Sequence, residues 1–197
     1  VRLSRSASIA MAIASVALAL GLFAWAHAGA QQELPLAEMA LQKDELPGSY
    51  QILNTGPTTF QDVSQPINSA NSTSFRVHSF LEAYKVNALV GQAEIGQYLY
   101  RYQDATQAEE QAQALITYAL QDPKSQPMQP VLVDDGSKGI PGVAGQTIRF
   151  TSPETGAVYY WFVDVQGRTL ILLVVGGPEN EHIRMTFEAL KAHVQQH

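Results

Sequence analysis

Alternating hydrophobic and polar positions predict several strands in the middle of the chain. In Phe75–Tyr84, an extended backbone puts Phe75, Val77, Leu81 and Ala83 on one face. In Ala93–Tyr102, three tyrosines fall on one face, and the other face carries Gln97 and Arg101. A period of two is typical of strands in a sheet that has one wetter face. We expect Gln97 and Arg101 on that wetter face.

The C-terminal third predicts three further strands, at Gly145–Phe150, Ala157–Val165 and Arg168–Val175. The last two are joined by Gln166-Gly167, which predicts a tight turn and an antiparallel hairpin. Every residue in Leu170–Val175 is apolar, as expected of a central strand covered on both faces. Shorter strands are predicted at 50–53 and 131–133.

Two main helices follow from apolar spacings of three and four residues. Asp104 offers a cap, Thr106-x-x-Glu109 resembles a capping box, and the helix runs to Leu120. Its predicted buried stripe is Ala108, Ala112, Leu115 and Ala119. The second helix is expected to start at Gly176-Gly177-Pro178, and its predicted buried face is Ile183, Phe187, Leu190 and Val194.

These elements predict an α+β fold, with an antiparallel sheet of five to seven strands packed by the two main helices. A short helix at 36–46 precedes them. Proline-containing polar stretches at 54–74 and 122–143 are predicted to be a surface loop and a connector. Two strands followed by a capped helix occur at 75–120 and again at 145–195. This order suggests an internal ββα pseudo-repeat, and chance similarity of two common arrangements is the alternative.

Residues 1–30 have the three parts of a secretory signal peptide. Arg2 and Arg5 form a basic start, Ile9–Ala26 is almost wholly apolar, and small residues around Ala28 and Ala30 offer cleavage sites. We expect cleavage before Gln31, which leaves 31–197 as a single extracytoplasmic domain, periplasmic, extracellular or at the cell surface. The alternative is an uncleaved anchor, because the apolar stretch is close to the length that spans a bilayer.

The net charge narrows the classes of partner, and the absence of cysteine limits how the domain can be stabilised. Without Arg2 and Arg5 the chain keeps 10 basic and 18 acidic residues, a formal charge of −8. Such a surface repels phosphate backbones, so nucleic acid is excluded as a partner. A membrane is expected as a partner only if the signal peptide at residues 1–30 is retained as an anchor. The chain has no cysteine, so packing rather than cross-links must stabilise the domain.

No histidine or serine falls in a pattern that predicts catalysis. His193 and His197 are spaced like metal ligands on a helix, but they lie at the C-terminus with no third ligand near them in sequence. His78 is predicted on a wetter strand face, and His182 on an exposed first helical turn. Ser137 lies in Asp135-Gly136-Ser137-Lys138-Gly139, which lacks the Gly-x-Ser-x-Gly order and is interpreted as a turn.

Carboxylates and aromatic residues give two weaker hypotheses. Asp134 and Asp135, with Asp122 or Glu154, lack the regular alternation of oxygen ligands found in a calcium loop. We therefore predict no catalytic, cofactor-binding or metal-binding residues and no cofactor. Aromatic side chains on neighbouring strands could line a ligand groove or form cross-strand core pairs, and the second arrangement is commoner. They are Tyr98, Tyr100, Tyr102, Tyr159, Tyr160 and Trp161.

The layout resembles exported bacterial α+β domains of uncharacterised or sensor-like type, including those found outside membrane serine/threonine kinases. The matching features over 36–195 are Asp44-Glu45-Leu46-Pro47-Gly48, Gly139-Ile140-Pro141-Gly142-Val143, the apolar hairpin and the amphipathic C-terminal helix. The resemblance implies an antiparallel sheet packed by helices and a non-catalytic role. It transfers no functional residue, and this sequence contains no kinase domain.

The sequence therefore favours a non-enzymatic extracytoplasmic module that binds a protein, peptide or small-molecule ligand or joins an envelope assembly. An accessory subunit that docks on a membrane complex is the first alternative. A periplasmic hydrolase is the second, and it lacks a predicted nucleophile, base or metal.

Overall fold

The chain folds around one seven-stranded antiparallel sheet in the computed structural model, which describes residues 34–58, 80–121, 125–134 and 145–196. The predicted signal peptide and cleavage site lie outside these residues. No helix in the described ranges is both long and apolar enough to cross a membrane. The elements between Leu36 and Val194 are α2 (Leu36–Met39), η1 (Lys43–Glu45), β1 (Tyr50–Pro57), β2 (Glu82–Val90), β3 (Ala93–Arg101), α4 (Ala105–Gln121), η2 (Gln126–Met128), β4 (Val131–Asp134), β5 (Gln146–Thr151), β6 (Ala157–Gln166), β7 (Thr169–Pro178) and α5 (Glu181–Val194).

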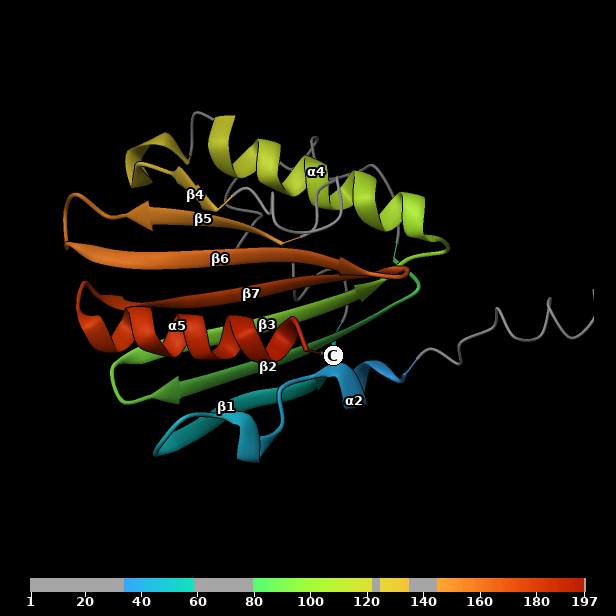
Figure 1. Cartoon of the computed structure of the whole chain (residues 1–197), viewed down its shortest axis with the longest axis horizontal. Coiled ribbons are helices and arrows are strands. Elements are labelled where there is room, and N and C mark those ends of the chain that lie inside the picture. Colours follow the sequence, from blue (N-terminus) through green and yellow to red (C-terminus); the bar gives the residue numbers. More distant parts are fainter. Residues whose placement is uncertain (1–33, 59–79, 122–124, 135–144, 197) are drawn as a thin grey trace, which may run out of the picture. The chain divides into compact units, whose positions relative to one another are not determined.

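The strands lie in the order β1-β2-β3-β7-β6-β5-β4, and every neighbouring pair is antiparallel (Figure 1). Strand β7 lies at the centre between β3 and β6, which explains why its sequence is apolar on both faces. Strands β1 and β4 are the two edges among the described strands. The predicted α+β class and the antiparallel sheet of five to seven strands are confirmed.

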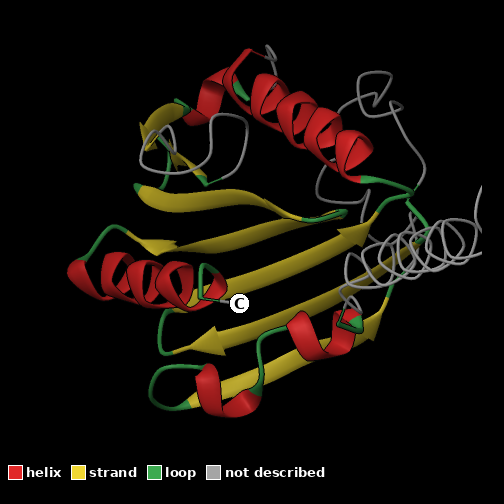
Figure 2. Cartoon of the chain, turned by 45° about the vertical axis from the view of Figure 1, so that its right-hand side comes forward, coloured by secondary structure: helices red, strands yellow, loops and turns green. Residues whose placement is uncertain are grey.

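Alternate residues of β7 define the two faces of the sheet. Ile171, Leu173 and Val175 belong to the hydrophobic cluster that contains the buried face of α5. Leu170 and Leu172 belong to the cluster that contains the stripe of α4. The two main helices therefore cover opposite faces, and Figure 2 shows the short helices α2 and η1 on the side of α5.

The N-terminal caps and the buried positions of the two main helices can be compared with the sequence patterns. The Asp104 carboxylate accepts a hydrogen bond from the Gln107 amide at 2.9 Å, which caps α4. The predicted buried stripe of α4 and the predicted buried face of α5 are buried at every position. The start of α5 was predicted wrongly: Gly176–Pro178 belong to β7, and Asn180 caps the helix by accepting from the Ile183 amide at 3.0 Å.

Other boundaries differ from the prediction. Strand β1 continues through residues 54–57 (Asn-Thr-Gly-Pro), because their backbones pair with β2. Strand β2 starts at Glu82 and runs to Val90, and Leu81 before it is exposed. The β6–β7 turn is Gly167-Arg168, with Gly167 at φ +58°, and Gln166 pairs with Thr169. The predicted helix at 36–46 is divided into α2 and η1.

The assignment of the wetter face of β3 was wrong. Gln97 and Arg101 are buried, with 1% and 7% of their surface exposed. The amide oxygen of Gln97 accepts from the Leu41 backbone at 2.7 Å, and Arg101 forms an ion pair with Glu82 at 2.6 Å. The segment that follows α2 therefore satisfies Gln97, and Glu82 of the neighbouring strand β2 pairs with Arg101.

Two strands followed by a helix do occur twice, as β2-β3-α4 and β6-β7-α5. However, β3 and β7 are antiparallel neighbours, and a two-fold rotation that exchanges them keeps each face of the sheet where it is. Such a rotation cannot superpose helices that cover opposite faces. The internal repeat is therefore not established by this arrangement.

Candidate functional site

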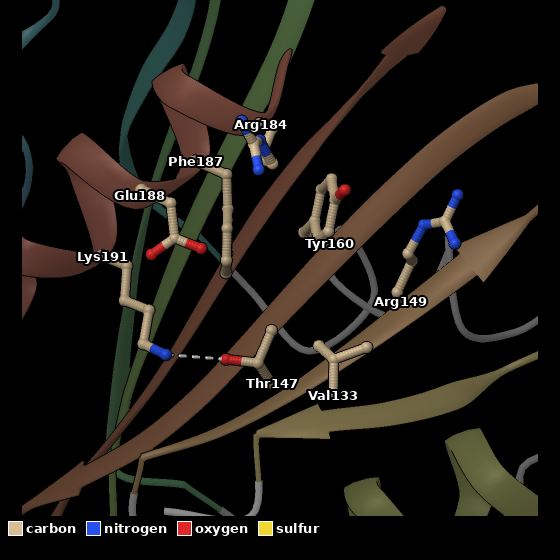
Figure 3. Close-up of a pocket in the computed structure, with 8 residues that line it drawn as sticks. All are labelled: Val133, Thr147, Arg149, Tyr160, Arg184, Phe187, Glu188 and Lys191. Carbon is tan, nitrogen blue, oxygen red and sulfur yellow. Dashed lines mark hydrogen bonds between the residues drawn. The ribbon is translucent and has the colours of Figure 1, made fainter. Parts of the chain in front are cut away.

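A pocket of about 460 Å³ lies between α5 and the end of the sheet formed by β4, β5 and β6 (Figure 3). It is on the face that α5 covers. Strand alternation supplies Thr147 and Arg149 from β5, and a spacing of three or four residues supplies the lining from α5. The lining residues are Val133, Thr147, Arg149, Tyr160, Arg184, Phe187, Glu188 and Lys191.

Lys191 is the deepest cation of the pocket. Its side chain is largely buried, its Nζ donates to the Thr147 hydroxyl at 3.1 Å, and the same Nζ lies 5.2 Å from the centre of the Phe162 ring. The hydroxyl and the ring fix the ammonium group in place, the ring through a cation–π interaction. Lys191 follows Phe187 by four residues, so the helix itself places this charge beside the apolar contact with the sheet.

Two arginines of the pocket lining are more exposed to solvent than Lys191. Arg149 forms an ion pair with Glu179, with side chains 32% and 59% exposed. Arg184 lies 3.9 Å from Glu181, and both side chains are mostly exposed. Solvent-exposed ion pairs of this kind contribute about 0–1 kcal/mol, so an incoming anion can replace either glutamate at low cost. Glu188 adds one carboxylate to the lining.

An aromatic wall completes the pocket. The ring of Tyr160 stacks on Phe187, with centroids 4.8 Å apart and planes 18° from parallel. Phe187 is 1% exposed and belongs to the core, so it fixes the position of the tyrosine ring. The pocket therefore has one buried and two more exposed basic side chains, next to the flat face of an aromatic ring. This arrangement suits an organic molecule that carries a negatively charged group.

The structure separates the predicted aromatic set. Tyr160 alternates with its neighbours on β6 and lies on the α5 face, in the pocket. The others belong to the cluster on the α4 face, where Tyr100 and Tyr102 are buried and Tyr98, Tyr159 and Trp161 are half-buried. Burial raises the pKa of the Tyr98, Tyr100 and Tyr102 phenols, which keeps them neutral. Core packing accounts for this set better than a groove does.

The histidines in the described residues do not meet. His182 is exposed and has its Nε2 3.1 Å from the Val90 carbonyl oxygen. His193 lies 3.1 Å from the Glu45 carboxylate. His78 and His197 lie outside the described residues, as do Ser137, Asp135 and Asp122. Within the described ranges, no cluster of three or more histidine or carboxylate side chains is arranged to hold a metal ion.

Sequence reasoning missed the pocket because its cations come from separate elements. Arg149 is on β5, while Arg184 and Lys191 are on α5, and only the fold brings these elements together. One local signal was available: Arg184, Glu188 and Lys191 recur at helical spacing along one side of α5, next to its buried face.

No family model matches the chain, and no curated protein matches it. Among solved structures, the chain is similar to the crystal structure of the extracellular domain of PknH from Mycobacterium tuberculosis. The TM-score is 0.54 and the sequence identity is 12%, over 82% of this chain and 95% of that one. Similarity at this identity shows a shared fold, and it agrees with the expected resemblance to exported bacterial domains.

Proposed function

We propose that this chain is a non-enzymatic extracytoplasmic module that binds an anionic ligand in the pocket between α5 and β4–β6. The observation that carries the proposal is the position of Lys191. The Lys191 ammonium group is largely buried, Thr147 and Phe162 fix its position, and it lines the pocket together with Arg149 and Arg184. Hydrogen bonds between an ammonium group and a carboxylate are about twice as strong as those between neutral groups.

The charge distribution supports this function. The chain is acidic, with a formal charge of −6, yet three basic residues line one pocket. An acidic surface repels anions in general, so anions that bind must be recognised locally. The likeness in fold to an extracellular domain and the predicted signal peptide both support a location outside the cytoplasm.

Calorimetric titration of the chain with glutarate and with inorganic phosphate tests the proposal. Lys191→Met keeps an unbranched apolar side chain over Phe162 and removes the charge, so we expect it to weaken binding about tenfold or more. Lys85→Met is the matched control. Lys85 alternates with Val86 and lies on the opposite face of the sheet, so this variant should bind like the unaltered chain. Equal binding by all three proteins would contradict the proposal.

The absence of catalysis is part of the same proposal. The Nε2 atom of His182 lies 3.1 Å from the Val90 carbonyl oxygen, which is not a group that a general base could deprotonate. General base catalysis needs the base within hydrogen-bond reach of its target and held by another group. Hydrolysis of an ester, peptide or glycoside that His182→Ala or His78→Ala abolishes would contradict this part of the proposal.

A further inference from the structure

The pocket opens beside an edge of the sheet. Strand β4 pairs with β5 on one side, and among the described strands nothing pairs with its other side. Its Val131, Leu132 and Val133 side chains are 54%, 40% and 52% exposed. An exposed edge strand with apolar side chains offers backbone donors and acceptors to another extended chain.

The irregular pairing of β4 connects this edge with the pocket. The register shifts between Leu132 and Asp134, and Val133 between them is not matched with a residue of β5. The Val133 side chain lines the pocket together with Thr147 and Arg149 of β5. Edge and pocket are therefore continuous on the face that α5 covers (Figure 3).

We infer that the ligand is an acidic peptide segment that adds to β4 as an extra antiparallel or parallel strand and directs a carboxylate side chain into the pocket. The inference rests on the proposed function, because it names the ligand of the same site. Charge decides the choice of occupant: backbone pairing alone would accept any extended chain, and the cations of the pocket select one that carries glutamate or aspartate.

The dimensions of a sheet agree with this arrangement. Strands lie about 4.8 Å apart, so a strand added to β4 lies roughly 10 Å from β5. The combined lengths of a glutamate side chain and of Arg149 span this distance. Arg149 is therefore the first cation to meet the carboxylate, after exchanging its exposed partner Glu179. Every second side chain of the peptide points to the same face, so a single acidic position per segment is sufficient.

The other edge of the sheet is a poorer candidate. Strand β1 also has a register shift, between Ile52 and Asn54, and exposes Tyr50 and Leu53. The cationic pocket is lined by residues of β4, β5, β6 and α5 and by none from β1. Backbone pairing at β1 would therefore lack the charge selection that the pocket provides beside β4.

Fluorescence anisotropy with labelled nine-residue peptides tests the inference. The peptides alternate threonine and valine, and a single glutamate is placed at each position from the second to the eighth. We expect a preferred glutamate position. Its replacement by glutamine, or Arg149→Gln in the protein, should weaken binding about tenfold. The control Lys85→Gln should leave binding unchanged, because Lys85 lies on the opposite face of the sheet.

N-methylation of single peptide bonds distinguishes strand addition from capture of the carboxylate alone. A methyl group removes the amide donor, so the loss of affinity should recur at every second position when one edge of the peptide pairs with β4. Binding that depends on glutamate but is insensitive to every N-methyl group would overturn the inference and leave the proposed function intact. The same holds if glutarate binds through Lys191 and no peptide of the set binds at millimolar concentration.

Light scattering tests the remaining alternative, in which a second copy of the chain pairs with β4. A stable dimer that Val131→Lys dissociates would show that β4 is closed by self-association and would overturn the inference. We expect a monomer whose mass increases only by that of the bound peptide.

Discussion

Phe187→Ala is the substitution that most directly tests the packing of α5 against the sheet. The ring is 1% exposed and stacks on Tyr160 at 4.8 Å. Truncation of a buried phenylalanine removes its transfer free energy and leaves a cavity, which together cost about 3–5 kcal/mol. The lost aromatic pair accounts for about 0.5–1.5 kcal/mol of this. The loss is a large fraction of the stability of an ordinary domain.

Urea unfolding, followed by circular dichroism and by tryptophan fluorescence, measures this loss. Met185→Ala is the matched control on the same helix, because Met185 is 61% exposed and its truncation should change the free energy of unfolding by less than about 0.5 kcal/mol. A loss below roughly 1 kcal/mol for Phe187→Ala, or equal losses for both variants, would refute the assigned buried face of α5.

Three further substitutions test separate contacts. Gly176→Ala would place a methyl carbon 2.2 Å from Cδ1 of Tyr159, so it should cost about 1–3 kcal/mol by urea unfolding, and a Tyr159→Ala background should relieve most of that cost. Asn180→Ala removes the cap of α5 and should cost about 0.5–2 kcal/mol; an unchanged midpoint would show that the cap is dispensable. Burial raises the pKa of Asp164, so the native state holds this proton more tightly than the unfolded chain does, and stability falls as the pH rises from the ordinary value through the raised one. Asp164→Asn should therefore gain stability relative to the unaltered chain as the pH rises above the ordinary pKa of aspartate, and parallel pH profiles would contradict the assigned burial.

The elements that bury a regular apolar face were predictable from the sequence. The stripe of α4 and the buried face of α5 follow from helical spacing, and β6 and β7 follow from largely apolar runs bounded by glycine. Strand β1 was predicted too short, because residues 54–57 (Asn-Thr-Gly-Pro) show no alternation of apolar and polar side chains and join the sheet through their backbones. Side-chain patterns cannot report such pairing.

The covered polar residues were not predictable from local pattern. Gln97 and Arg101 lie on a strand face that alternation assigns to solvent, yet both are buried. The Leu41 amide donates to Gln97, and Glu82 of β2 pairs with Arg101. The pocket was missed for a related reason. Lys191 follows the spacing of an apolar face, and only the neighbouring Thr147 and Phe162 of the sheet make a buried ammonium group stable there.

The most direct test of the account is a chemical-shift titration of the isotope-labelled chain with the preferred glutamate peptide, observed at backbone amides and side chains. The two faces of the sheet offer alternative sites: the cationic pocket under α5 and the half-buried aromatic residues under α4. We predict that the largest shifts fall on Thr147, Arg149 and Lys191. The largest shifts at Tyr98, Tyr159 and Trp161, with the pocket unaffected, would contradict the account.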